Sequence, residues 1–224
     1  MNGWRALLAA GALAVAACSP AAAADAVFDA PVAQRTANET GGMKTAVFSG
    51  GCFWGVEAVF SHTKGVQSAV SGYHGGAAGN ANYRAVSGGM TNHAESVRVV
   101  YDPSVVRYDQ LLQIFFSVIA DPTLKDRQGP DVGAHYRSAL VPVTREQRAV
   151  AGAYLEQIRR SGVWSDPIVT AIEPYKEFYP AETYHQDFAH KNPNNAYIKR
   201  WDAPKVAALR QMFPSLYSSS FQTG

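Results

Sequence analysis

The chain has 224 residues, of which 47% are hydrophobic and 17% charged, an ordinary composition for a globular domain with short appendages. The net charge is +2, from 20 basic and 18 acidic residues, and basic residues occur only singly or in pairs such as Arg159-Arg160. This balance excludes a strongly basic nucleic-acid-binding surface.

The N-terminus has the pattern of an export signal. One positive charge, Arg5, precedes the apolar run ALLAAGALAVAA, and Cys18 follows. A cationic start before an apolar run too short to span a bilayer predicts a signal peptide, which we place over residues 1–24. The letters VAAC, ending at Cys18, also fit a bacterial lipobox, which would make Cys18 a lipid anchor, whereas small residues at 21–26 offer an ordinary cleavage site. Both routes predict a protein exported to the periplasm or cell envelope.

Residues 25–43 are polar and alanine-rich without periodicity and end in two glycines, which predicts a linker. The letters KTAVFSGG then predict a strand that begins at residue 44. A helix is expected just after Cys52, because apolar residues recur at helical spacing: Phe53, Val56, Val59 and Phe60. A short strand over 65–73 and a glycine-rich loop up to residue 82 follow.

The rest of the chain also alternates strands with helices. Residues 93–102 predict a strand that places Glu95, Val97 and Val99 on one face, and residues 108–120 predict a helix. The remaining elements are a strand over 136–143, a helix over 145–160 opened by a capping box of Thr144 and Gln147, a strand over 167–175 and a helix from Pro204.

The order β-α-β-β-α-β-α-β predicts an α/β (α+β) fold: a loop-rich two-layer sandwich in which helices pack on a mixed sheet with a ferredoxin-like core. We expect residues 44–200 to form one domain and residues 201–224 to form a C-terminal helix and tail.

Cys52, in the stretch SGGCFWGVEAVF, is the only cysteine after residue 18. A lone thiol is either a small buried hydrophobe or an activated nucleophile. If Cys18 is lipidated or removed, Cys52 has no partner in its own chain, and a thiol kept in an oxidising compartment favours a chemical role. At a helix N-terminus the macrodipole would favour the thiolate. Phe53 and Trp54 point in different directions, so at least one should line a site.

Glu95 shares its strand face with two valines. If that face is inward, burial raises the pKa of the carboxyl and keeps a general acid protonated near neutrality. The alternative is an edge position that faces solvent, and the alternation does not decide between them.

Four blocks of the sequence resemble the peptide methionine sulfoxide reductases of the A type: GCFWGVEAVF, NYRAVSGGMTNHAESVRVVYDP, QGPDVGAHYRSAL and YPAETYHQDF. The similarity extends from about residue 44 to 195. It implies reduction of the S epimer of methionine sulfoxide, free or in proteins, with Cys52 as nucleophile and Glu95 as acid. It further implies that the remaining site residues bind substrate: Tyr83 and Tyr136 at the sulfoxide oxygen, Phe53 and Trp54 at the methyl group, and Asp131 in support.

The resemblance implies no cofactor, and the six histidines show no metal-ligand spacing such as His-x₃-His. Cys52 would become a sulfenic acid. Many relatives carry a recycling cysteine after the letters NPNN, but this chain continues AYIKR and has no cysteine after Cys52. We therefore expect an external thiol reductant: a thioredoxin-like protein, glutathione or a small thiol. The chain also departs from the usual pattern at Asn92, Pro130, Ala134 and His135.

Two other functions compete with this interpretation. One is a cysteine acyl-transferase or hydrolase that pairs Cys52 with His185 as base. The other is a non-enzymatic module that binds apolar side chains through Phe53 and Trp54.

Overall fold

The computed structural model describes residues 27–224, so the expected signal peptide, Cys18 and the first two linker residues lie outside the described residues. The strands are β1 (Lys44–Gly50), β2 (Val66–His74), β3 (Ala94–Tyr101), β4 (Arg127–Gln128), β5 (Asp131–Val132), β6 (Ser138–Val141), β7 (Ala171–Ile172) and β8 (Phe178–Pro180). The α-helices are α1 (Phe53–Ser61), α2 (Tyr83–Ser87), α3 (Tyr108–Ile114), α4 (Arg145–Arg160), α5 (Phe188–Lys191) and α6 (Ala203–Met212). Short 3₁₀ turns are η1 (Ala78–Asn80) and η3 (Ala134–Tyr136), and π-turns are η2 (Phe115–Ile119) and η4 (Ile198–Asp202).

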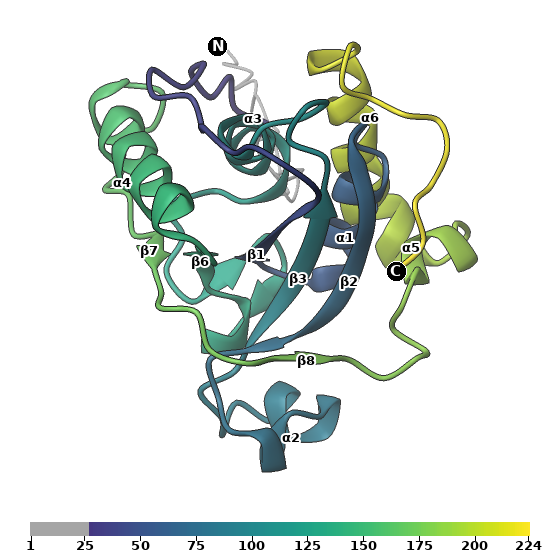
Figure 1. Ribbon diagram of the computed structural model, residues 1–224. Helices are drawn as coiled ribbons and strands as arrows, with labels where there is room; N and C mark the ends of the chain where they lie inside the picture. Colours follow the sequence, from purple (N-terminus) through teal and green to yellow (C-terminus); the bar gives the residue numbers. More distant parts are fainter. Residues whose placement is uncertain (1–26) are drawn as a thin grey trace, which may run out of the picture.

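The main sheet has six strands in the order β7-β6-β1-β3-β2-β8, and only the β6–β7 pair is parallel (Figure 1). Helix α1 connects β1 to β2, and α3 connects β3 to β6. The four central strands therefore form the βαββαβ arrangement of ferredoxin-like folds. The predicted order of elements and the mixed sheet are confirmed.

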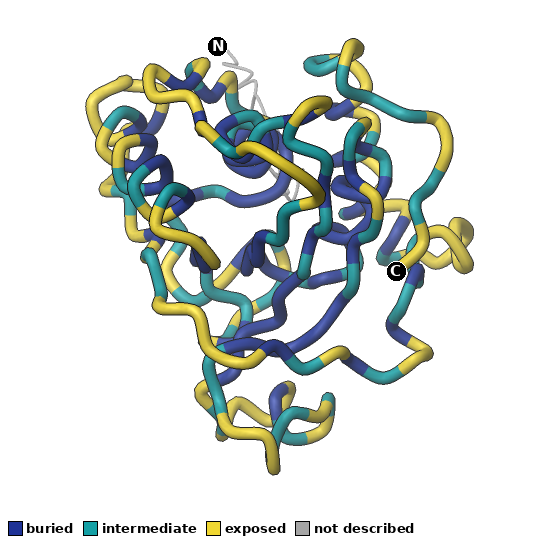
Figure 2. Tube along the Cα trace, viewed as in Figure 1, coloured by how far each residue is buried: buried dark blue, intermediate teal, exposed yellow. Residues whose placement is uncertain are grey.

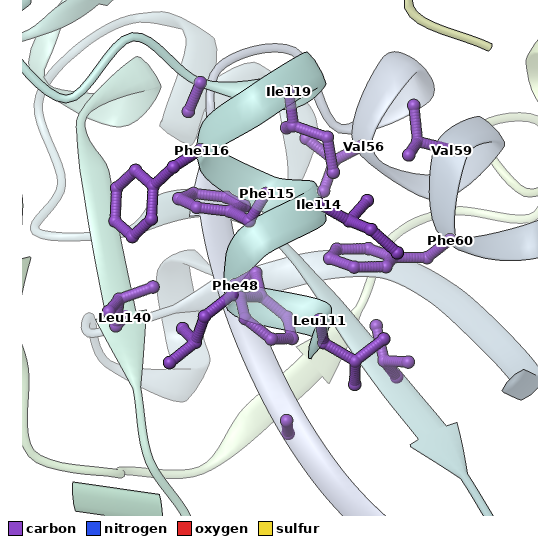
Figure 3. Close-up of a cluster of buried hydrophobic side chains, with 14 of the residues drawn as sticks. Phe48, Val56, Val59, Phe60, Leu111, Ile114, Phe115, Phe116, Ile119 and Leu140 are labelled. Atoms are coloured by element: carbon purple, nitrogen blue, oxygen red, sulfur yellow. The ribbon is translucent and has the colours of Figure 1, made fainter. Parts of the chain in front are cut away.

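The core lies between the sheet and the helices α1 and α3 (Figure 3). Phe48 of β1 lies at its centre, with its ring centroid 4.8 Å from Phe60 of α1 and 5.5 Å from Phe115. Most residues of the central strands and of α3 are buried, and these elements are largely dark in Figure 2. This rigid core fixes the loop between β1 and α1, where Cys52 lies.

Three elements differ in detail from the prediction. The strand expected over 167–175 is reduced to Ala171–Ile172, because only these residues pair with β6. The helix expected over 108–120 ends in a π-turn. The capping box is half formed: Thr144 Oγ1 accepts the Gln147 N–H at 3.1 Å, but the Gln147 side chain accepts the N–H of Val143 instead of that of Thr144.

The described part of the expected linker, residues 27–43, has no helix or strand, yet it is fastened to the domain. The Tyr154 hydroxyl donates to the Pro31 carbonyl at 2.7 Å, and the Ala37 N–H donates to Asp109 at 2.8 Å. Three of its small side chains are buried in the hydrophobic core: Ala30, Ala33 and Ala37. The domain boundaries themselves stay a prediction.

The C-terminal tail folds back over the end of α1. The Ser218 N–H donates to the His62 carbonyl at 2.7 Å, and the Gln222 N–H donates to the Ser61 carbonyl at 3.0 Å. In residues 27–224 we find no helix with the length and apolar character that crossing a bilayer requires.

Candidate active site

Cys52 occupies the N-cap position of α1, so the helix begins just after it as predicted. The preceding Gly51 has φ +89°, a conformation that side chains rarely adopt. A Cβ at Gly51 would also lie 2.6 Å from the Cβ of Gln128 in β4. Glycine at this position therefore lets the β4–β5 hairpin pack directly against the loop that carries the thiol.

Glu95 is 2% exposed and lies on the same core-facing side of β3 as Val97 and Val99. Of the two interpretations, the solvent-facing edge position is wrong. The Phe53 N–H, at the start of α1, donates to Glu95 Oε2 at 3.0 Å, so the carboxylate lies beside the residue that follows Cys52. Burial raises the pKa of Glu95 to about 8, against the opposing effect of that hydrogen bond, with smaller contributions from Asp131 and Asp202.

Burial also raises the pKa of Cys52, and the negative charges of Glu95, Asp202 and Asp131 add to the effect. The N–H of Trp54 acts in the opposite direction. The expected preference for thiolate at the helix N-terminus is therefore outweighed, first by burial of the thiol and then by the nearby negative charges. Cys52 and Glu95 titrate as a coupled pair, in which ionisation of one disfavours ionisation of the other.

The two aromatic residues after Cys52 have different surroundings. Phe53 is 1% exposed, and its ring centroid lies 5.9 Å from Tyr73 and 4.9 Å from His185. Trp54 is half-buried; its indole stacks on Phe188 at 3.8 Å and donates its N–H to His185 Nδ1 at 3.1 Å. Phe53 thus belongs to the core and Trp54 to the surface of the site.

The two phenols come from short helices outside the sheet. Tyr83 is the first residue of α2, at one end of the molecule in Figure 1, and Tyr136 is the last residue of η3. The pKa of each is raised, first by burial and then by the charge of Glu95, and Cys52 contributes to both. Both phenols therefore lie within electrostatic range of Cys52 and Glu95.

Asp131, in β5, accepts a hydrogen bond from the hydroxyl of Tyr197. The Tyr197 ring also meets the Trp54 indole edge-on, with centroids 5.9 Å apart and planes at 84°. Tyr197 is not among the site residues expected from the sequence. It lies in the letters AYIKR, two residues after the NPNN block, and this position is the only sequence signal that indicates it.

His185 does not act as a base toward Cys52 in this arrangement. Its Nδ1 accepts from Trp54, its Nε2 is buried without a hydrogen-bond partner among the described residues, and burial lowers its pKa. The histidine instead holds the Trp54 indole in place.

Three of the four positions that depart from the usual family pattern, Asn92, Ala134 and His135, lie in the segments around Tyr136. The His135 ring packs against the Tyr136 ring at 4.1 Å, and the carbonyls of Asn92 and Ala134 both accept hydrogen bonds from Arg137. Pro130 is exposed in the β4–β5 turn. In the part of the chain that the structure describes, no three His, Cys, Asp or Glu side chains are arranged to hold a metal ion.

The site combines a thiol with a buried carboxyl whose raised pKa suits it to donate a proton at neutral pH, two phenols that can donate hydrogen bonds to one oxygen, and a half-buried indole. Such a set can protonate an oxygen while sulfur attacks the atom to which that oxygen is bound.

Comparison with known proteins agrees with this chemistry. A family model described as "Peptide methionine sulfoxide reductase" matches residues 44–216. The chain is 54% identical over 177 residues to peptide methionine sulfoxide reductase MsrA 2 of Mesorhizobium japonicum, an alignment that covers 79% of this chain and 91% of the relative. It is 50% identical over 168 residues to MsrA of Deinococcus radiodurans, covering 75% and 81%.

Solved structures give the same result. Reduced Mxr1 from Saccharomyces cerevisiae superposes with a TM-score of 0.62 at 33% identity, covering 72% of this chain and 92% of the yeast chain. Methionine sulfoxide reductase A of Corynebacterium diphtheriae superposes with a TM-score of 0.59 at 36% identity, covering 70% and 78%.

Proposed function

The chain belongs to the peptide methionine sulfoxide reductase family, and from this premise we propose how its own side chains carry out the reaction. The protein is an oxidoreductase that reduces methionine sulfoxide to methionine, the reaction by which oxidised proteins are repaired. The assignment of steps to residues rests on the site geometry.

The reactive form of the site holds one proton on the Cys52–Glu95 pair: the thiol, whose pKa burial raises, has lost its proton, and Glu95 keeps its own. A sulfoxide sulfur is a poor electrophile until its oxygen is protonated, so Glu95 in its acid form donates its proton to that oxygen while the Cys52 thiolate attacks the sulfur. The oxygen then passes to Cys52. Methionine leaves, Cys52 becomes a sulfenic acid and Glu95 becomes a carboxylate.

Tyr83 and Tyr136 donate hydrogen bonds to the substrate oxygen, and their raised pKa values keep both phenols protonated. The indole of Trp54, backed by Phe53, contacts the methyl group, and Asp131 supports the site through Tyr197. Because oxygen and methyl group are each bound on a fixed side, the site should select one epimer of the sulfoxide, which we propose is S.

The observation that carries this proposal is the hydrogen bond from the Phe53 N–H to Glu95 Oε2, since it fixes the acid beside the nucleophile. The test is incubation with each epimer of dabsyl-methionine sulfoxide and dithiothreitol. Conversion of the S epimer alone to methionine supports the proposal. Equal conversion of both epimers would contradict the specificity, and cleavage of amides or esters without methionine formation would indicate an acyl-transferase. Binding without turnover would indicate a binding module.

We further propose that an external thiol resets the enzyme, because no cysteine follows Cys52 in the sequence. The donor, a thioredoxin-like protein, glutathione or a small thiol, would form a mixed disulfide with Cys52 and release water. One equivalent of sulfoxide without reductant should give one equivalent of methionine and a Cys52 that dimedone labels. An intramolecular disulfide after that single turnover would contradict the proposal, because it would require Cys18.

Export to the cell envelope is supported by Arg5 and the apolar run that follows it. Mass spectrometry of the mature N-terminus distinguishes the routes. An acylated Cys18 would indicate a lipid anchor, Asp25 as first residue would indicate an ordinary cleaved signal, and an intact Met1 would contradict export.

A further inference from the structure

Arg137 directly follows Tyr136, and its guanidinium makes four hydrogen bonds. It binds Glu173 in a bidentate manner, with Nε–Oε1 at 2.6 Å and Nη2–Oε2 at 3.1 Å. It also donates to the carbonyl of Ala134 at 3.0 Å and to the carbonyl of Asn92 at 3.1 Å. The side chain is 21% exposed: its two bonds to Glu173 are partly buried, and its bonds to the two carbonyls lie at the surface. A planar guanidinium suits such a bidentate and branched set, which an ammonium group cannot reproduce.

The three segments that Arg137 joins are far apart in sequence. Ala134 starts η3, the turn that ends at Tyr136. Asn92 lies in the loop that leads into β3, three residues before Glu95. Glu173 follows β7 at the edge of the sheet, 36 residues after Arg137. The arginine therefore ties the turn that carries one phenol to the loop that precedes the acid, and fixes both to the sheet.

The other phenol has a separate anchor. The Tyr83 N–H donates to Glu182 Oε1 at 2.9 Å, and the hydroxyl of Tyr73, in β2, donates to Glu182 Oε2 at 2.8 Å. No hydrogen bond or ion pair among those found in residues 27–224 connects this anchor to Arg137. Each phenol thus has its own polar contact. Helix α2 is also held by Val86, which is buried in the core, whereas η3 contributes no residue to the hydrophobic cluster, so the position of Tyr136 depends more on its polar contact.

We propose that Arg137 is a positioning residue for the reduction: by clamping Ala134 and Asn92 to Glu173, it holds the Tyr136 hydroxyl at the sulfoxide oxygen. This proposal rests on the role of Tyr136 given above. Without the clamp, η3 keeps its fold but the phenol samples positions away from the oxygen. Misplacement of a catalytic group by about 1 Å can cost up to ~100-fold in rate.

The test is a double-mutant cycle on the single-turnover rate of methionine formation, with KM measured in parallel. Arg137→Gln should lower the rate about tenfold, since the phenol is displaced and not removed, with a smaller change in KM. In a Tyr136→Phe background, Arg137→Gln should cost less than about twofold, because there is no hydroxyl left to position. In a Tyr83→Phe background, Arg137→Gln should lower the rate by about tenfold or more, as it does in the wild type.

An equal loss from Arg137→Gln in both backgrounds would overturn the proposal, because the arginine would then act independently of Tyr136. If Tyr136→Phe alone left the rate unchanged, Tyr136 would have no role in the reaction. The proposal that Arg137 positions it would then be wrong as well. Arg35→Gln is the matched control, because it also removes a guanidinium that pairs with a glutamate. Arg35 lies on the surface, with Nη2 3.0 Å from Glu146 Oε2, and its loss should leave the rate unchanged.

A second variant keeps Arg137 and tests the proposal in case Arg137→Gln does not fold. Glu173→Gln retains one acceptor for the guanidinium and both carbonyl contacts, but loses the ionic bond. It should show the same dependence on Tyr136 as Arg137→Gln, with a smaller loss of rate. Additivity of Glu173→Gln with Tyr136→Phe would overturn the proposal even if Arg137→Gln does not fold.

Discussion

Glu57 and Glu95 are both buried, at 1% and 2% exposure, and in each case burial is the main cause that raises the pKa to about 8. Their contacts differ. Glu57, on α1, accepts hydrogen bonds from the backbone N–H groups of Ser71 at 3.3 Å and Asp187 at 2.9 Å, and so joins α1 to β2 and to the segment before α5. Glu95 accepts one N–H and lies with the thiol and the phenols.

A raised carboxyl pKa therefore does not by itself identify a catalytic acid. What separates the two glutamates is what lies around them: the Glu57 oxygens accept hydrogen bonds from two backbone N–H groups, whereas Glu95 lies beside the residue that follows Cys52 and within electrostatic range of Tyr83 and Tyr136. Substitutions in the two surroundings should affect different properties, activity near Glu95 and stability near Glu57.

The largest effect should come from Cys52→Ser, which should abolish reduction. A serine hydroxyl is far less acidic and less nucleophilic than a thiol, and its oxygen cannot form the sulfenic acid. The assay is methionine formation from dabsyl-methionine sulfoxide under excess dithiothreitol. Turnover above background in the purified variant would contradict the role of Cys52.

Glu95→Gln should lower the single-turnover rate by about two orders of magnitude, the usual cost of losing a positioned acid. The pH dependence should change as well. In the wild type the rate should rise as pH approaches about 8, where the Cys52–Glu95 pair loses its first proton, and it should fall at higher pH, where the pair loses the proton that Glu95 supplies. The glutamine variant should lack this fall. Glu95→Asp should retain more activity. If the glutamine variant matched the wild type, a phenol would have to be the acid.

Tyr83→Phe and Tyr136→Phe should each reduce the rate less than Glu95→Gln does, because either phenol can partly replace the other at one oxygen. The double variant should lose considerably more than the product of the two single losses. Single-turnover rates for all four proteins test this. An unchanged rate in the double variant would remove both phenols from the reaction.

The parts of this arrangement that depend on local pattern were predictable from the sequence. Helical spacing after Cys52 placed the thiol at a helix start, and the alternation of strands and helices gave the βαββαβ order. Alternation failed at Glu95, because its neighbours Ala94 and Ser96 on the other face are buried too. A strand covered on both faces loses the polar–apolar contrast that indicates which side is inward.

Contacts between distant segments were not predictable from one sequence. Tyr197 and Asp131 are 66 residues apart, and nothing in either local pattern indicates that they meet. The same holds for residues 27–43, which have the composition of a linker. Their alanines are buried in the hydrophobic core, and the segment is held by hydrogen bonds to Asp109 of α3 and Tyr154 of α4, contacts that exist only in the folded chain.

Glu57→Gln should have the smallest effect on activity. It should instead change the stability of the protein, and this change should depend on pH. A group whose folded-state pKa is raised from 4.5 to about 8 contributes stability that is fully present below pH 4.5 and is lost as pH rises toward 8. Glutamine does not ionise, but its amide nitrogen must face one of the two backbone N–H groups, which costs about 1–3 kcal/mol. The variant should therefore be less stable than the wild type at pH 5, and the difference should shrink by pH 8.

Urea unfolding at pH 5, 6.5 and 8 measures this change in stability, with the reduction rate recorded in parallel and expected to stay within about threefold of the wild type. Glu156→Gln is the matched control, because that glutamate is 48% exposed on α4 and its ion pairs lie on the surface. Its stability relative to the wild type should not vary with pH. A pH-independent cost for Glu57→Gln would mean that Glu57 is ionised throughout, held by its two N–H donors against the effect of burial. A rate loss as large as that of Glu95→Gln would mean that the two glutamates do not differ in function, because the proton of Glu57 would then be needed for the chemistry.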